Sequence, residues 1–423
     1  MLTRDVRNAL FAGLLLVVLA GGGLGWYFLA SPAGHTVKGR APSATGKPAE
    51  RGKTKTAPSA AKAPPNKQGG SGNNQVTSAV YASGSSVPVA PPGYTKGTVA
   101  ARNLPPAGGI RGIFLTGYVA GSSRMPGLIT QLKAAGMNAV VINVKDDAGN
   151  ITWQMNLPAA KAAGADSSQI TNIGALLKTL KANHIYAIGR IVTFKDPVYA
   201  AAHPGQAVQA AGGGLWHDSM GEAWLDPYNR ANWRYVVDVA KQAAAVGFQE
   251  IQFDYVRFPA DGNHAGLVYP DYTSRVVPAE VISSFLRYAD RKLAPYGVEV
   301  GADVFGLVTV AHNDLGIGQE LLPVAGAVNI ISPMTYPSLY ANGSFGLANP
   351  ALHPYTVVYK SVHTARLRLT NGPAVDFVPW IQDFSLWGVN YGAAQLQAQV
   401  RAVKNAGYNQ WMVWNPACVY NIP

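Results

Sequence analysis

The feature that most constrains this chain is a repeated alternation of two kinds of segment between Arg111 and Trp414. Short apolar runs rich in β-branched residues alternate with longer amphipathic stretches, a pattern typical of βα units built around a parallel sheet. The runs predict eight strands: Gly112–Tyr118, Ala139–Lys145, Tyr186–Thr193, Glu250–Asp254, Glu299–Val304, Val328–Met334, Val375–Ile381 and Gln410–Trp414. Eight parallel strands joined by helices predict an α/β fold, the (β/α)8 TIM barrel.

The amphipathic stretches between these strands are expected to be helices. They are Pro126–Ala135, Ile173–Ala182, Arg230–Val246, Pro278–Ala294, Gly318–Leu322, Tyr355–Leu367 and Gly392–Ala406. Several end on a glycine just before the next strand, as at Gly136 and Gly247, which fits left-handed helix caps that lead into a strand. Because nine residues follow Trp414, we expect the last helix of the barrel to be short or missing.

The first 105 residues differ in composition from the rest of the chain. Residues 1–100 carry eleven Lys and Arg but two acidic residues, and so hold +9 of the net charge of +12. The uncharged apolar run Ala9–Ala30 follows Arg4 and Arg7, so residues 1–30 are expected to be a cytoplasmic tip and a transmembrane signal anchor. A cleaved signal peptide, which would make the protein secreted, is the alternative. Both alternatives place an Ala/Pro/Lys/Gly-rich disordered linker, 31–105, and a barrel domain, 106–423, outside the cytoplasm.

Composition and motifs argue against several other classes of function. Nucleic acid is not an expected partner, because the part after residue 100 is nearly neutral and contains no recognisable nucleic-acid module. The single cysteine, Cys418, rules out an internal disulfide framework, and the histidines lack the spacing of a zinc site. No metal or other cofactor is therefore predicted. The motifs of serine hydrolases, P-loop proteins and zinc proteases do not occur.

Two aspartates at the ends of neighbouring predicted strands are the catalytic candidates. In the segment Glu250–Asp254 the polar side chains alternate with Ile251 and Phe253, and Asp254 comes last. Barrel enzymes place catalytic groups at this end of a strand. Asp303 has a similar position on the next strand, and adjacent strands lie about 4.8 Å apart, close to the roughly 5–5.5 Å separation of a retaining carboxylate pair.

Further polar and aromatic residues lie at the carboxyl ends of the predicted strands or in the long loop after the third strand, and are candidates for binding substrate. They are Tyr118, Lys145, Asp146, Arg190, Trp224, Asp226, Tyr255, Arg257, Tyr336, Gln382, Asp383 and Trp414. Carboxylates supply the acid, base or nucleophile of sugar cleavage, while aromatic faces stack on sugar rings. A calcium loop around Asp146 is conceivable, but its spacing gives no complete set of ligands and an ordinary turn is the better interpretation.

Between Arg111 and Trp414 the chain resembles the putative glycoside hydrolase domain family of bacterial TIM barrels. The motif Phe253-Asp254-Tyr255-Val256-Arg257-Phe258-Pro259 is the most specific, and Gly117-Tyr118, Val141-Ile142-Asn143-Val144-Lys145-Asp146 and Pro333-Met334-Thr335-Tyr336-Pro337 add to it. The resemblance implies a barrel that acts on glycans, with Asp254 as the catalytic carboxylate. The chain is more distantly similar to chitinase-like and amylase-like barrels. Chitinase-like barrels carry a glutamate where this chain has Val256, so their mechanism is not carried over.

The sequence thus predicts a membrane-tethered, extracytoplasmic glycoside hydrolase that cleaves the O-glycosidic bonds of a polysaccharide. It is expected to retain configuration, with Asp254 as nucleophile and Asp303 as acid/base. Two alternatives remain open: a barrel that binds glycan without cleaving it, and a structural protein of the cell envelope. The sequence makes no prediction of the sugar, the linkage or the oligomeric state.

Overall fold

The computed structural model describes residues 103–422, in which eight parallel strands close into a barrel. These are β1 (Arg111–Leu115), β2 (Ala139–Lys145), β3 (Tyr186–Val192), β5 (Glu250–Asp254), β7 (Glu299–Phe305), β8 (Ile330–Met334), β10 (Trp380–Gln382) and β11 (Trp411–Trp414). Each pairs with the next in this order, and β11 pairs with β1 to complete the ring. The predicted (β/α)8 fold is confirmed in this arrangement of strands.

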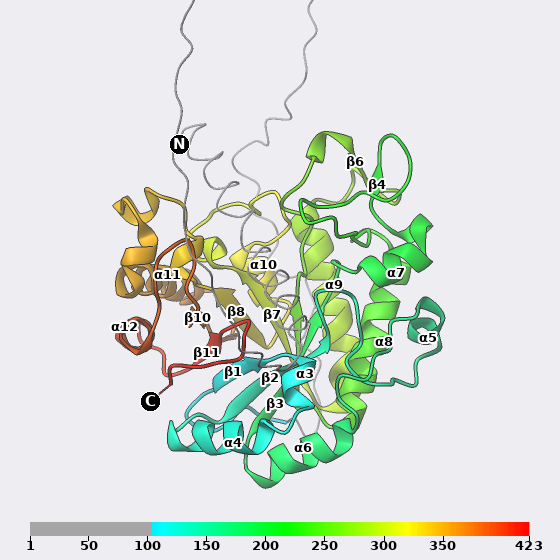
Figure 1. Ribbon diagram of the computed structural model, residues 1–423. Coiled ribbons are helices and arrows are strands. Elements are labelled where there is room, and N and C mark those ends of the chain that lie inside the picture. Colours follow the sequence, from blue (N-terminus) through cyan, green and yellow to red (C-terminus); the bar gives the residue numbers. More distant parts are fainter. Residues whose placement is uncertain (1–102, 423) are drawn as a thin grey trace, which may run out of the picture. The chain divides into compact units, whose positions relative to one another are not determined.

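Helices lie around the outside of the strands (Figure 1). The helices that the sequence predicted are α4 (Met125–Ala134), α6 (Ile173–Ala182), α8 (Arg230–Val246), α9 (Pro278–Leu293), α10 (Leu321–Ala325), α11 (Pro354–Leu369) and α12 (Ala393–Asn405). Residues 415–422 contain no helix after β11. In its place, Ile422 lies with Trp411 and Leu396 in a groove between α4 and α12.

Several short elements were not predicted. They are α3 (Gly117–Ala120), α5 (Pro158–Ala163), α7 (Pro197–Ala202), the antiparallel pair β4 (Gln209–Ala210) and β6 (Leu267–Val268), and the 3-10 turns η1 (Pro204–Gln206), η2 (His264–Gly266), η3 (Ala294–Tyr296), η4 (Gly306–Thr309), η5 (Pro337–Leu339), η6 (Ser344–Gly346) and η7 (Pro350–Leu352). They belong to connections rather than to the barrel wall, so their apolar periods are too short to stand out in the sequence.

Two predicted strands need correction. The first strand ends at Leu115 and not at Tyr118, because the Thr116 side chain accepts a hydrogen bond from the Val119 N–H and so caps α3. The seventh predicted strand, Val375–Ile381, consists of two pieces, β9 (Asp376–Phe377) and β10. Pro379 lies between them and has no N–H to donate to a neighbouring strand.

The strand β5 shows how the fold positions its polar residues. Ile251 and Phe253 face the helices, and the Phe253 ring meets the edge of Phe285 on α9 at a centroid distance of 5.3 Å. The alternate residues, including Asp254, therefore face the barrel axis. The register pairs Phe253 of β5 with Ala302 of β7, so the next residues along, Asp254 and Asp303, emerge side by side at the carboxyl ends of the strands.

No helix within residues 103–422 is long and apolar enough to cross a membrane. The predicted anchor at Ala9–Ala30 and nearly all of the predicted linker lie outside the described residues.

Candidate active site

A cavity opens at the carboxyl ends of the barrel strands, the end at which the sequence placed its candidate residues. Half of the fourteen predicted site residues line it. These are Asp254, Asp303, Arg190, Tyr255, Arg257, Tyr336 and Trp414. They come from β3, β5, β7, β11 and the segments that directly follow β5 and β8, so only the closed barrel brings them together.

Asp254 is held by a buried arginine at the floor of the cavity. Oδ2 of Asp254 accepts hydrogen bonds from Nε of Arg190 at 2.9 Å and from Nη2 at 2.6 Å. Oδ1 accepts one hydrogen bond, from the Tyr255 backbone N–H at 2.7 Å. A carboxylate oxygen has two lone pairs, so Oδ1 keeps one for the cavity. The guanidinium thus places a positive charge directly beside this carboxylate.

The same guanidinium also binds Asp147, which follows β2. Nη1 of Arg190 donates to Oδ2 of Asp147 at 3.1 Å, and Nη2 donates to Oδ1 at 3.3 Å. Burial is the largest single influence and by itself would raise the pKa of Asp147, but the charge and hydrogen bonds of Arg190, together with Lys195 and Tyr255, hold the pKa below its ordinary value. Arg190 thus joins two carboxylates that line the cavity.

Asp303 lies in a different environment, although it faces the same cavity. Its side chain is 1% exposed, and Oδ1 accepts a hydrogen bond from the indole N–H of Trp380 at 2.7 Å. Burial first, and the charge of Asp254 second, raise the pKa of Asp303 well above its ordinary value. Asp303 therefore keeps its proton to a higher pH than an ordinary aspartate, and since Oδ1 accepts from Trp380, Oδ2 is free to carry the proton.

Aromatic rings form much of the remaining wall. Trp414 stacks on Phe114 with a centroid distance of 4.0 Å and meets Trp380 edge to face at 5.5 Å. Tyr336 meets the edge of Phe384 at 5.7 Å. All five rings line the cavity. Flat apolar faces beside carboxylates are suited to holding a sugar ring, whose C–H groups pack against them.

Comparison with known families identifies the barrel. A family model described as "Putative glycosyl hydrolase domain" matches residues 112–420. The chain belongs to this family. The resemblance noted in the sequence is therefore confirmed, and the match spans the barrel from β1 to the residues after β11.

Solved structures are similar to this glycosyl hydrolase-type barrel. The glycoside hydrolase domain of PgaB (BpsB) from Bordetella bronchiseptica has a TM-score of 0.54 at 13% identity, covering 73% of this chain and 94% of that domain, which shows a common fold. A hypothetical protein from Ruminiclostridium thermocellum is 39% identical, with 45% of this chain and 97% of that chain covered and a TM-score of 0.42. An α-galactosidase from Thermus thermophilus is 13% identical, with 77% and 60% covered and a TM-score of 0.44. No curated protein matches the chain.

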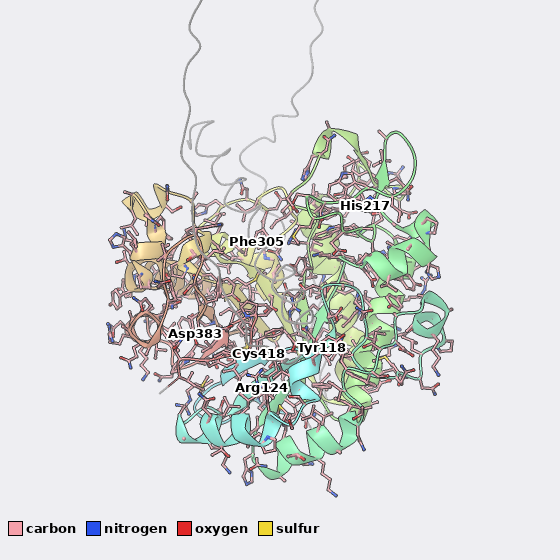
Figure 2. The ribbon with its side chains drawn as sticks, viewed as in Figure 1. Tyr118, Arg124, His217, Phe305, Asp383 and Cys418 are labelled. Atoms are coloured by element: carbon pink, nitrogen blue, oxygen red, sulfur yellow. The ribbon has the colours of Figure 1, made fainter. Side chains whose placement is uncertain are left out.

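Three residues predicted near the first two strands do not line the cavity. Tyr118 is 65% exposed on α3 and lies away from Phe305, which lines the cavity at the end of β7 (Figure 2). Lys145 is fully buried on the outer side of the ring of strands, where its ammonium group pairs with Oδ2 of Asp196 at 2.5 Å. The register shift between Asn143 and Lys145 explains why Asn143, rather than Lys145, faces Arg190.

Asp146 also holds local structure. Oδ1 of Asp146 accepts from the N–H groups of Ala148 at 3.1 Å and Asn150 at 2.9 Å, and Oδ2 accepts from Gln169 at 2.8 Å. This is the turn that the sequence favoured over a calcium loop. Burial raises the pKa of Asp146. Its neighbour Asp147 is the one that reaches the cavity.

The other four predicted residues support loops around the cavity. Trp224 lies behind it, under Arg257, and donates its indole N–H to Asp218 at 3.0 Å. Asp226 accepts from the N–H groups of Tyr228 and Asp271, and burial raises its pKa to about 6.

Gln382 and Asp383 follow the same pattern at β10. Gln382 donates to Oγ of Ser338 at 2.8 Å and accepts from the Ser338 N–H at 3.0 Å, and so holds the segment after Tyr336. Asp383 accepts two hydrogen bonds from Asn421, and burial raises its pKa.

Several residues of the cavity were missed by the sequence reasoning, namely Phe114, Asn143, Asp147, Asp261, Phe305, Trp380 and Phe384. Some carried a usable signal. Asp147 shares its segment with the predicted Asp146, and Phe305 directly follows the strand that bears Asp303. Trp380 lies within the predicted seventh strand, but a tryptophan in a strand is most often a core residue. Among residues 103–422, no cluster of three or more His, Cys, Asp or Glu side chains could hold a metal ion.

Proposed function

We propose that this barrel is a glycoside hydrolase that cleaves the O-glycosidic bonds of a polysaccharide. The proposal is carried by one observation: two carboxyl groups share a cavity but lie in different surroundings, since Arg190 binds Asp254 while burial raises the pKa of Asp303. Asp254 is paired with a guanidinium and Asp303 is not. A difference of this kind separates the nucleophile from the acid in sugar-cleaving sites. The family description and the aromatic wall support a sugar as the ligand.

The two carboxyl groups would act in sequence. Asp303 donates the proton on Oδ2 to the glycosidic oxygen, and the bond from that oxygen to the anomeric carbon breaks. A lone pair of Asp254 Oδ1 attacks the anomeric carbon and forms a glycosyl ester. Water then attacks the same carbon and Asp303 accepts a proton from this water. Asp254 leaves as a carboxylate, which pairs again with Arg190.

The strand register supports a retaining outcome. Asp254 and Asp303 follow paired residues of adjacent strands, which lie about 4.8 Å apart in a sheet. Retaining enzymes separate their carboxyl groups by roughly 5–5.5 Å, whereas inverting enzymes need roughly 6.5–9.5 Å to admit a water molecule. Two neighbouring strand ends suit the shorter separation.

We further propose that the barrel works outside the cytoplasm, tethered to the cell membrane by the apolar segment Ala9–Ala30. Arg4 and Arg7 precede this segment, and such residues favour the cytoplasmic side. A polysaccharide of the cell envelope would be within reach of a tethered barrel.

The test compares glycan cleavage by the wild-type chain, Asp254→Asn and Asp238→Asn on a panel of bacterial envelope polysaccharides. Asp254→Asn should lose at least about 1,000-fold in rate, because an amide cannot form the glycosyl ester. Asp238→Asn makes the same change of charge on the outer face of α8, where Asp238 pairs with Lys241, and should cleave at the wild-type rate. Equal cleavage by Asp254→Asn would remove Asp254 from the mechanism. Saturable binding without products would point to a glycan-binding barrel.

A further inference from the structure

Arg257 and Asp261 lie on the turn that follows β5, and both line the cavity. Each is buried, with 4% and 5% of its surface exposed. The turn is fixed by contacts with a distant segment: the Phe258 N–H donates to the Ile317 carbonyl at 2.9 Å, and the Gln319 side chain donates to the Val256 carbonyl at 3.3 Å. The two charged groups are therefore presented to the cavity by a packed turn.

The guanidinium of Arg257 is held mainly by aromatic rings. It lies over Trp224 at 4.8 Å, Tyr255 at 5.0 Å and Phe305 at 4.7 Å, measured to the ring centroids. Within the described residues, the guanidinium donates one hydrogen bond, from Nη1 to the Phe258 carbonyl at 3.1 Å. Within residues 103–422, no carboxylate lies within ion-pair distance of this guanidinium. Four further N–H donors of the guanidinium are available to a ligand.

Asp261 is also incompletely bonded. Its Oδ2 accepts a hydrogen bond from the hydroxyl of Ser219. Its Oδ1 is buried, and no hydrogen-bond donor reaches it within the described part of the chain. A buried acceptor without a partner destabilises the fold, so a ligand that supplies a donor recovers that energy.

We propose that Arg257 and Asp261 form a subsite that recognises a hydroxyl group of a neutral sugar. A hydroxyl can accept from the guanidinium and donate to Oδ1 of Asp261 at the same time. An ammonium group offers no lone pair to Arg257 and is repelled by it, and a carboxylate offers no proton to Asp261 and is repelled in turn. That the ligand is a sugar rests on the proposed function; that it is neutral at this point rests on the pair itself.

The experiment measures binding rather than cleavage, so its outcome is independent of the test on Asp254. The full-length chain is titrated with glucose, glucosamine and glucuronic acid, and with galactose, galactosamine and galacturonic acid, by ligand-observed NMR. At least one neutral sugar should bind about 10-fold or more tighter than its amino and uronic counterparts. This ordering requires no variant, so a folding defect cannot hide it.

Two variants then separate the contributions of the pair. Asp261→Asn should weaken binding of the neutral sugar about 10- to 100-fold and reduce the disadvantage of the uronic acid, because Arg257 remains. Arg257→Gln should reduce the disadvantage of the amino sugar, because Asp261 remains. Asp238→Asn on α8 should change neither preference. A residue that only holds the turn would weaken all six sugars equally.

Three results would overturn the subsite: tighter binding of an amino sugar or a uronic acid by the wild-type chain, no binding of any of the six sugars, or ratios of affinity in Asp261→Asn and Arg257→Gln that equal those of the wild type. If the sugars bind as expected while no polysaccharide is cleaved, the hydrolase proposal fails and the subsite stands. If cleavage depends on Asp254 but the preferences do not follow charge, the subsite fails and the hydrolase proposal stands.

Discussion

At the scale of the residue, Asp254 and Asp303 carry the same side chain on adjacent strands but have different partners. Asp254 is bonded to Arg190 through Oδ2, whereas Asp303 has a neutral partner, the indole of Trp380. The difference arises from what other strands of the barrel contribute, because β3 supplies the cation and β10 supplies the indole. Ionisation of Asp303 is therefore expected to lower the stability of the folded chain as well as its activity.

This gives a prediction for the stability of Asp303→Asn at different pH. The pKa of Asp303 is higher in the folded chain than in the unfolded chain, where it is near 3.8. The stability gained from binding the proton is complete below that unfolded value and is lost as the pH rises through the folded value, by about 1.4 kcal/mol per pH unit. Asparagine cannot ionise and can still accept from Trp380. The free energy of unfolding of the variant, relative to that of the wild type, should therefore increase as the pH rises from about 4 to 8.

Thermal unfolding of both proteins across this pH range provides the measurement. Melting curves that shift in parallel with pH would contradict the raised pKa of Asp303. Glycan cleavage by the wild type should in addition fall on the alkaline side as Asp303 loses its proton, since the ionised group can no longer act as an acid.

At the scale of the element, the end of β7 lies against β8 because residue 306 has no side chain. A Cβ atom at Gly306 would lie 2.5 Å from the Met334 carbonyl oxygen and would also meet the Tyr340 hydroxyl. Phe305, the preceding residue, lines the cavity and packs against Arg257. The close approach of β7 and β8 therefore fixes one wall of the site.

Gly306→Ala should accordingly lower the free energy of unfolding by about 1–3 kcal/mol, because β7 and β8 must move apart. The matched control is Gly127→Ala in α4, where a Cβ atom meets nothing within 4 Å and should stabilise the helix by about 0.5–1 kcal/mol. Urea denaturation of both variants measures the two changes. Equal stabilities for Gly306→Ala and the wild type would show that the strands can separate at no cost.

At the scale of the whole molecule, the described residues that line the cavity all belong to the barrel domain. The cavity residues come from strands that are far apart in sequence, from Phe114 on β1 to Trp414 on β11. Pairing of these two strands closes the ring, with Ile113 opposite Val413. The proposed tether, by contrast, belongs entirely to the segment before the barrel.

This division predicts how the chain partitions in the cell. The full-length chain should sediment with membranes, whereas a chain that begins at residue 103 and is made in the cytoplasm should remain in the soluble fraction. An added protease that cannot cross the membrane should cut the full-length chain after residue 31. Identical fractionation of the two chains would contradict the tether, and recovery of a shortened, soluble full-length product would indicate cleavage of a signal peptide.

The sequence by itself determined the number of strands, the bounds of β2 and β5, and the positions of Asp254 and Asp303. These follow from period-two alternation of apolar and polar residues, which is a local property of a strand. Helices α6 and α8 were likewise placed at their observed bounds by their own periodicity.

Only the tertiary structure decided which neighbouring polar residue enters the cavity. The shift in register at the end of β2 gives Asp147 to the cavity and Lys145 to an ion pair outside the barrel. The loop position of Asp261 and the bond from Trp380 to Asp303 depend on contacts between distant segments. Such contacts have no period in the sequence, because they are set by how the strands close and how the loops pack over them.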